Sequence, residues 1–178
     1  EIGHSPPDDL RMRLYVDRAH WLGLSRDTKN CVRDYLEALK LASEPADLVH
    51  IKSMLALAFF QLDKKETAIY WSIQAVEHDP KNSEGHHIFG LICSFLEFYT
   101  FAVSALERAV NLNPSDWSAR VKLGECLRED GRLNESIKLL SECVEQRPND
   151  PQAFFELAWS IQLCFDYQDR HRTATKLY

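Results

Sequence analysis

The sequence predicts an all-α protein built as an array of antiparallel helix pairs. Three prolines, Pro80, Pro114 and Pro148, recur at an interval of 34 residues, which is typical of helical repeats. Small side chains precede each proline at the same three distances; they are Ala56, Gly90, Gly124, Ala68, Ala102, Ser136, Ala75, Ala109 and Cys143. Apolar residues recur at helical spacing, and no segment has the alternating pattern of a strand. Nine or ten helices and no sheet are therefore expected.

Each 34-residue unit is expected to contain two helices joined by a short turn. In the first unit, apolar side chains within Val49–Gln61 repeat at the spacing of one helical face. A second helix, Lys64–His78, is expected to start at a capping arrangement of Asp63 and Glu66 and to end before Pro80. The small residues at fixed positions would let the two helices approach closely.

Residues that commonly cap helices stand where the next units begin. Asn82 precedes the helix expected over Ser83–Phe98, and Ser115 has the same place one unit later. Asn149 or Asp150 would cap the last unit. A proline follows them in the first helical turn, where its missing N–H is not needed.

A 34-residue helix–turn–helix unit with small residues at its positions 8, 20 and 27 and proline at position 32 resembles the tetratricopeptide repeat. Counted in this register, the chain divides into a tail and helix cap at 1–11, a divergent repeat at 12–48, repeats at 49–82, 83–116 and 117–150, and an incomplete C-terminal repeat at 151–178. In the tail, Ser5-Pro6-Pro7-Asp8 is expected to provide the cap and first turn of the opening helix.

The resemblance implies that successive repeats stack into a right-handed superhelix, with the first helix of each repeat lining the concave face. The incomplete repeat departs from the pattern at Arg170, where a small residue is expected. We therefore expect the last helix, over 166–178, to be frayed, displaced or packed on another molecule.

Charge and hydropathy exclude two classes of partner. The 178 residues include 21 Lys and Arg against 27 Asp and Glu, a net charge of −6, which disfavours nucleic acid. The most apolar windows, Met54–Phe60 and Ile88–Leu96, are much shorter than the roughly 18 to 20 residues that a bilayer requires. We expect neither nucleic acid nor membrane as a partner.

The five cysteines are odd in number and lack CxxC spacing. This favours reduced, buried thiols over a disulfide framework or a zinc site. Cys31 and Cys143 occupy positions where the repeat requires a small side chain, so packing explains them better than nucleophilic chemistry. A cytoplasmic location is expected, with a nuclear one as the alternative.

No convergent set of catalytic residues is visible. The seven histidines are scattered, and the adjacent His86 and His87 would point to different sides of a helix. HExxH, GxGxxG, P-loop and GxSxG motifs are missing from the sequence. We therefore expect a protein that is not an enzyme and that holds neither cofactor nor metal.

The resemblance also implies which side chains line the groove, because positions 2, 5, 9, 12 and 13 of each repeat usually face it. The residues expected to form the partner-binding groove are His50, Ser53, Leu57, Phe60, His87, Leu91, Phe95, Val121, Glu125, Arg128, Phe155 and Trp159. Six of these, in two or more repeats, are large and apolar, so the groove would present a hydrophobic strip to a partner.

Two known binding modes of the family lack their residues here. Chaperone-binding members clamp a carboxylate with Lys and Asn, but Ser53 and Leu57 stand at the first two clamp positions. The asparagine ladder of the O-GlcNAc transferase superhelix is replaced at position 6 by Met54, Ile88, Lys122 and Glu156. A carboxylate-clamp chaperone interaction is therefore not expected.

The function predicted from the sequence is a protein-interaction scaffold or adaptor that binds an amphipathic helix or extended peptide. A substrate-recognition arm of a larger enzyme, such as a glycosyltransferase, is the alternative from another class; a catalytic domain following Tyr178 would favour it. Self-association through the terminal repeat is a third interpretation. The apolar strip also has a purely structural explanation, since aromatic residues at helical spacing often belong to a core.

Overall fold

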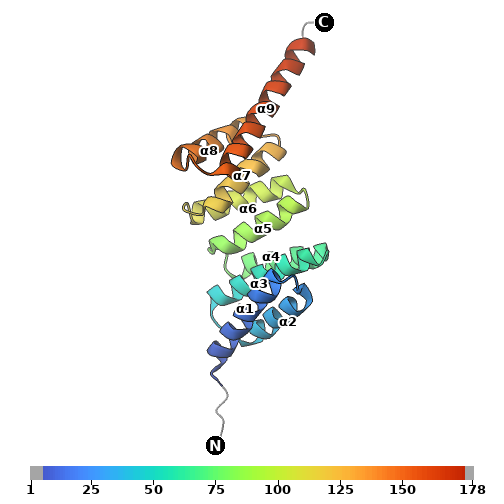
Figure 1. Ribbon diagram of the computed structural model, residues 1–178, viewed down its shortest axis with the longest axis vertical. Helices are drawn as coiled ribbons and strands as arrows, with labels where there is room; N and C mark the ends of the chain where they lie inside the picture. The colour runs from blue at the N-terminus through green and yellow to red at the C-terminus, as the bar shows by residue number, and fades with distance from the viewer. Residues whose placement is uncertain (1–5, 175–178) are drawn as a thin grey trace, which may run out of the picture. The chain divides into compact units, whose positions relative to one another are not determined.

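The computed structural model describes residues 6–174 of the chain, with side chains described for 6–166. Nine α-helices and no strand occupy this stretch (Figure 1). The helices are α1 (Asp8–Leu24), α2 (Thr28–Leu41), α3 (Pro45–Gln61), α4 (Lys65–His78), α5 (Ser83–Phe95), α6 (Tyr99–Leu112), α7 (Trp117–Glu129), α8 (Leu133–Gln146) and α9 (Pro151–Ala174). The predicted all-α array of sequential antiparallel helix pairs is confirmed.

The chain divides into two compact units, Glu1–Leu96 and Glu97–Tyr178, called the N-terminal and C-terminal units below. In the N-terminal unit, α1 packs on α2, α2 on α3, and α3 on both α4 and α5. The small residues predicted to allow close packing, such as Ala56, Ala68 and Ala75, are completely buried there.

In the C-terminal unit, α7 packs on α6 and α8, and α9 packs on both α7 and α8. The α7–α8 pair is in contact at Gly124, where a Cβ atom would lie 2.5 Å from the side chain of Leu140. Beside this contact, the Ser136 hydroxyl donates a hydrogen bond to the Gly124 carbonyl oxygen at 2.7 Å. Glycine is thus needed here for close approach of the two helices.

The turns within four helix pairs each contain one residue of positive φ: Arg26, Asp63, Glu97 and Gly131. The predicted capping role of Asp63 is wrong. Its φ is 57°, and α4 has Lys64 at its N-cap with no side-chain hydrogen bond. Asp63 N–H instead donates to the Phe60 carbonyl oxygen at 2.9 Å, so Asp63 ends α3. The expected helix over Ser83–Phe98 likewise stops at Phe95, just before the left-handed turn residue.

The caps of the first helices agree with the sequence in two cases and differ in two. The Asn82 side chain accepts from the N–H groups of Glu84 and Gly85, and Asp150 accepts from those of Gln152 and Ala153. The cap of α7 is Asp116 and not Ser115, its neighbour, because the Asp116 carboxylate accepts from Ala119 N–H at 3.0 Å.

The opening helix begins one residue later than the predicted cap implies. Pro7 is its N-cap and makes no side-chain hydrogen bond, so a capping side chain plays no part there. Ser5, the residue expected to cap this helix, lies outside the described residues.

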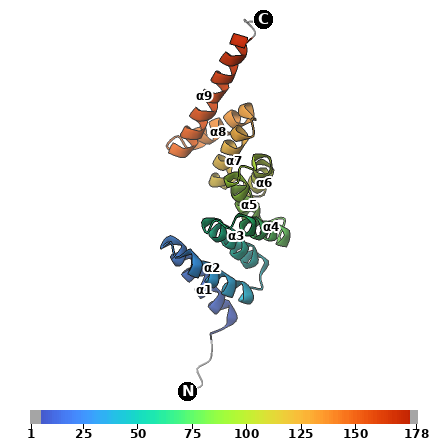
Figure 2. The same ribbon diagram turned by 90° about the vertical axis from the view of Figure 1, so that its right-hand side faces the viewer.

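The last helix differs most from the repeat pattern. α9 is a single helix of 24 residues, whereas α5 and α7, the first helices of their pairs, have 13 each. It continues beyond α7 and α8 (Figure 2). Phe165 stands 34 residues after Gly131, at the position of the left-handed turn, and a bulky aromatic residue disfavours that conformation. A separate second helix beginning near residue 166 therefore does not form. The Arg170 side chain, which motivated the expectation of a displaced helix, lies outside the described side chains.

Candidate functional site

An apolar surface of the N-terminal unit is formed by α3 and α5, which lie against each other. The Phe60 and Phe95 rings stack with their centroids 5.0 Å apart and an interplanar angle of 22°. Leu57 and Leu91 stand one turn before these rings on the same two helices. We call these four residues the α3/α5 patch. Four predicted groove residues are therefore brought together from two consecutive repeats.

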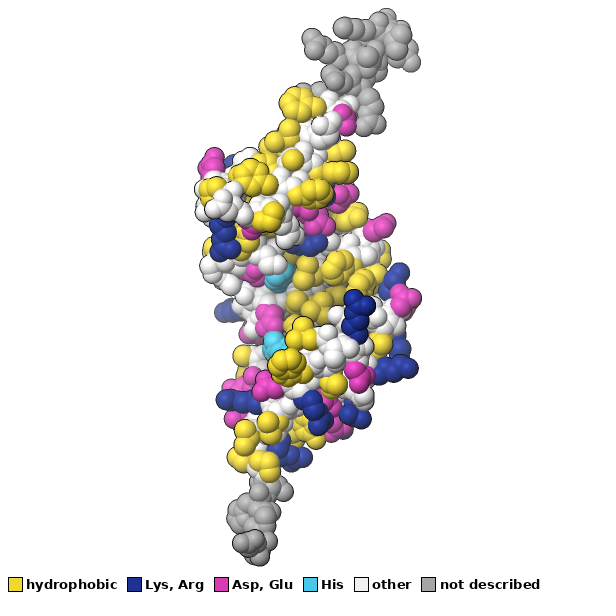
Figure 3. Space-filling model, in the orientation of Figure 1, with side chains coloured by type: hydrophobic (Ala, Val, Ile, Leu, Met, Phe, Trp, Pro, Cys, Tyr) yellow, Lys and Arg dark blue, Asp and Glu magenta, His cyan; other side chains and the backbone are white. Residues whose placement is uncertain are grey.

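The patch is anchored to the core on one side and open on the other. Leu57, Phe60 and Leu91 are half-buried and pack against a cluster that includes Ile88 and Ile92. Phe95 remains 49% exposed, a large fraction for an aromatic side chain in a folded domain. Figure 3 shows hydrophobic side chains gathered at the level of α5 and along α9. The patch thus combines a rigid base with accessible apolar area.

A polar cluster lies toward the N-terminal ends of the same helices. His50 Nδ1 and Glu84 Oε1 are 2.6 Å apart, joining α3 to α5. The hydrogen bond to Glu84 raises the pKa of His50 above its ordinary value. The His20 ring of α1 lies edge-on to His50, with the centroids 5.6 Å apart, and burial followed by the charge on His50 lowers the pKa of His20. A carboxylate and two imidazoles therefore precede the apolar patch along these helices.

The two other predicted groove residues of the N-terminal unit lie between the polar cluster and the α3/α5 patch. His87 is half-buried on α5. Ser53 is completely buried on α3, and its hydroxyl makes no hydrogen bond within the described part of the chain. Ser53 therefore offers a partner no surface of its own.

In the C-terminal unit, the predicted groove residues take different roles. Val121 is buried in the α7–α8–α9 core, and Glu125 accepts a hydrogen bond from Lys122 at 2.7 Å. Arg128 is also buried, and its guanidinium donates to Glu156 at 2.5 Å and to Glu129 at 2.9 Å. Arg128 is therefore held within the protein by two carboxylates.

Phe155 and Trp159 are the two predicted groove residues of α9, and both are accessible. Their ring centroids lie 6.1 Å apart at an interplanar angle of 30°, and the side chains are 59% and 52% exposed. The Arg128 guanidinium lies over the Trp159 ring at 6.0 Å. These contacts hold a pair of exposed aromatic rings next to a buried ion pair.

Two partners of the predicted residues were missed from the sequence, although the repeat register could have found them. Glu84 stands 34 residues after His50, so both occupy position 2 of consecutive repeats. His20 occupies position 9 of the divergent first repeat, the position of Leu57 in the next one. Equivalent positions of neighbouring repeats therefore contact each other along α1, α3 and α5.

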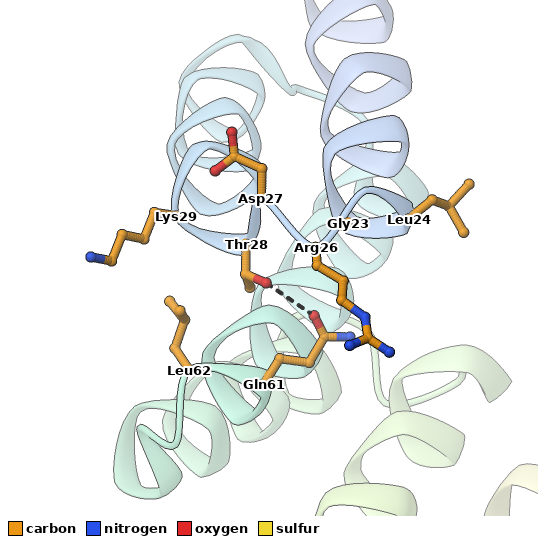
Figure 4. Close-up of a pocket in the computed structure, with 8 residues that line it drawn as sticks. All are labelled: Gly23, Leu24, Arg26, Asp27, Thr28, Lys29, Gln61 and Leu62. Carbon is orange, nitrogen blue, oxygen red and sulfur yellow. Dashed lines mark hydrogen bonds between the residues drawn. The ribbon is translucent and has the colours of Figure 1, made fainter.

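A cleft in the N-terminal unit, where the turn between α1 and α2 meets the end of α3, gives no sign of catalysis (Figure 4). Its basic side chains, Arg26 and Lys29, point away from each other. Asp27, its one carboxylate, accepts a hydrogen bond from the Asn30 side-chain amide at 2.6 Å and caps α2. The remaining polar contact is a long one, 3.5 Å from Thr28 Oγ1 to Gln61 Oε1. The cleft does not bring titratable groups together on one reacting point.

Three further findings concern chemistry and location. Four of the five cysteines are buried, as predicted, and Cys164 is half-buried. Within the described residues, no three His, Cys, Asp or Glu side chains are grouped closely enough to hold a metal ion. None of the described helices combines the length and the apolar character that crossing a membrane requires.

Comparison with known proteins identifies the repeat. The tetratricopeptide repeat family model matches residues 99–154. No curated protein matches the chain significantly.

Solved structures of similar fold cover most of the chain. The crystal structure of YrrB, a TPR protein with an unusual peptide-binding site, has a TM-score of 0.66 and 22% identity, covering 87% of this chain and 76% of that chain. MamA MSR-1 C2 has a TM-score of 0.69 and 19% identity, covering 90% of each chain. A MamA RS-1 double mutant has a TM-score of 0.72 and 17% identity, covering 93% of this chain and 89% of that chain. The tetratricopeptide repeat is therefore confirmed as the family of residues 99–154, and the chain has the fold of a tetratricopeptide-repeat protein.

Proposed function

We propose that this protein is a non-enzymatic interaction scaffold that binds an amphipathic helix or extended segment of another protein on the α3/α5 patch. The observation that carries the proposal is the stacked Phe60–Phe95 pair, which joins two helices and leaves half of Phe95 accessible. A preformed aromatic surface of this kind has little ordering entropy to lose when a partner binds. YrrB, a protein of the same fold, has a peptide-binding site, which supports a similar role here.

The chemistry of the surface specifies the kind of partner. Leu57, Phe60, Leu91 and Phe95 are uncharged and apolar, so they suit leucine-like or aromatic side chains spaced three and four residues apart on a partner helix. The polar cluster of His50 and Glu84 lies toward one end of the surface. It suits a hydrogen-bond donor or basic group beside the partner's apolar residues. A recognition arm of a larger enzyme would use the same surface.

The test compares two glutamate variants of the full chain as baits for affinity capture. Phe95→Glu places a charge in the patch, whereas Tyr70→Glu places one at a similarly exposed aromatic residue, 55% exposed, on α4 of the same unit. Proteins that the wild type and Tyr70→Glu retain and Phe95→Glu loses are purified, and their dissociation constants are measured by calorimetry. We expect Phe95→Glu to weaken binding about tenfold or more.

Circular dichroism of each variant controls for folding, and the milder Phe95→Gln replaces Phe95→Glu if the latter loses helicity. Captured proteins that bind both variants as tightly as the wild type contradict the proposal. Loss of binding only when helicity is lost also contradicts it, because the aromatic pair would then act as core.

A further inference from the structure

A second apolar surface, unrelated to the α3/α5 patch, runs along α9 in the C-terminal unit. It consists of Phe154, Ala158, Ile161 and Phe165, which we call the α9 stripe. Successive spacings of four, three and four residues place these side chains on one face of the helix. The three large members are 46%, 36% and 60% exposed, in that order. Three large apolar side chains in one row are unusual on a free surface.

The opposite side of α9 makes the contacts with the rest of the unit. Ala153 and Ser160 are completely buried, and Ser160 Oγ lies 2.9 Å from Ser136 Oγ of α8. Glu156 is buried in its ion pair with Arg128 of α7. The stripe is therefore a separate face that α7 and α8 do not cover.

The same face is covered by a helix in other pairs of this chain. Ala19 of α1 and Ala56 of α3 occupy the repeat position of Ala158, and both are completely buried, whereas Ala158 is exposed. Gly124 holds this position in α7 and lies directly against Leu140 of the pairing helix. The stripe thus has the composition of a helix-packing face. Because α9 continues through Phe165 without a turn, no described helix of the chain returns to cover it.

We propose that the α9 stripe is the interface of a homodimer in which the α9 helices of two copies pack antiparallel about a twofold axis. The spacing of the stripe reads the same in both directions. Phe154 therefore faces Phe165 of the second copy, and Ala158 faces Ile161 of the second copy. Large side chains meet at the two ends and a small one meets a branched one at the centre, as in an antiparallel coiled coil. A twofold interface requires this self-complementarity.

The residues beside the stripe are compatible with two identical copies. They are Phe155, Leu157, Gln162 and Cys164, and none is charged. Two copies in this arrangement therefore bring no like charges together along the interface.

An exposed apolar row also exists on α1, where Leu10, Leu14, Trp21 and Leu24 are 47% to 78% exposed. Asp17 lies in the middle of that row. A partner helix packed there would bury a carboxylate, which is costly without a compensating charge. The row on α1 is therefore less suited to self-pairing than the α9 stripe.

The oligomeric state of the whole chain tests the proposal by analytical ultracentrifugation over a wide concentration range. We expect a dimer for the wild type and a monomer for Ile161→Glu and for Phe165→Glu. Trp159→Gln is the matched control, because it changes an equally exposed aromatic residue on another face of the same helix. It should remain dimeric. A wild-type monomer at all concentrations, or assembly that grows past the dimer, overturns the proposal.

Cross-linking tests the arrangement of the helices independently of any loss of folding. In a Cys164→Ser background, Phe154→Cys and Phe165→Cys chains are mixed and treated with a short bismaleimide. The antiparallel pair places positions 154 and 165 of different copies together, while equal positions lie ~16 Å apart along the axis. We expect cross-linked dimers from the mixture and little from either variant alone. Efficient cross-linking of each variant with itself would indicate a parallel pair and overturn the proposal.

Discussion

At the residue scale, the close approach of paired helices depends on positions where a side chain larger than hydrogen or methyl does not fit. Ala56, Ala68 and Ala75 are completely buried at such positions. Their spacing in the sequence made these contacts predictable, because a 34-residue interval leaves few arrangements in which all copies serve the same purpose. The sequence could not show that the requirement is strictest at Gly124.

Gly124→Ala should destabilise the C-terminal unit. The added Cβ would lie 2.5 Å from the side chain of Leu140, which is completely buried and has no free space to move into. Overpacking of this kind costs about 1 to 3 kcal/mol, more than the helix propensity gained. Gly23→Ala is the control, because its Cβ would meet only Cys31 Sγ at 3.7 Å. Denaturant titration should show Gly124→Ala less stable, and Gly23→Ala at least as stable, as the wild type; equal effects would refute the packing explanation.

Glu156→Ala should be strongly destabilising, because it leaves the Arg128 guanidinium buried with one carboxylate fewer. The side chains of this pair are 7% and 9% exposed. Breaking such a pair costs about 3 kcal/mol. Glu129→Ala removes the other, more exposed carboxylate, 38% accessible, and should cost less than about 1 kcal/mol. Free energies of unfolding that rank the two variants in the opposite order would contradict this assignment.

The His50–Glu84 pair should make stability depend on pH. Because the pKa of folded His50 is raised above that of the unfolded chain, its contribution is complete below about pH 6.5 and declines as the pH rises through the folded value. Glu84→Gln keeps a hydrogen-bond acceptor and removes the charge. The stability difference between the wild type and Glu84→Gln, measured in urea, should therefore be larger at pH 6 than at pH 9. A difference independent of pH would show that the charge contributes nothing.

At the element scale, the boundaries of the helices follow from local backbone chemistry that the repeat pattern only partly reveals. The caps Asn82 and Asp150 could be predicted because their side chains precede helices in the usual way. Asp63 has the same composition but sits in a left-handed turn, and the neighbouring turns use Arg26 and Glu97, residues with no preference that would show it. The length of α9 could not be predicted either, because the missing turn depends on one aromatic residue.

Two substitutions distinguish the cap from the turn residue. Asn82→Ala should lower stability by about 1 kcal/mol, because the N–H groups of Glu84 and Gly85 lose their acceptor. Asp63→Gly should leave stability unchanged or raise it, since glycine adopts the φ of 57° without strain. Thermal or urea denaturation gives both values. A loss of stability for Asp63→Gly comparable with that of Asn82→Ala would restore the capping role of Asp63.

At the scale of the whole molecule, the period, the helical content and the apolar groove positions were accessible from the sequence. They depend on a pattern repeated along most of the chain. The role of each groove residue was not accessible, because it depends on contacts between repeats. Of the predicted residues, Val121 and Arg128 became core, whereas Phe60 and Phe95 formed the stacked pair. The α9 stripe was hidden for the same reason, since its residues follow the pattern of a normally covered face.

The central claim is that a partner protein contacts the α3/α5 patch, and site-specific photo-cross-linking tests it most directly. Benzoylphenylalanine is introduced at position 95 and, in a separate chain, at position 70, which is exposed on α4. Each chain is irradiated with a partner identified by capture. We predict a covalent adduct with the partner from position 95 and none above background from position 70. Adducts from position 70 alone, or none from position 95 while the complex is intact, would contradict the account.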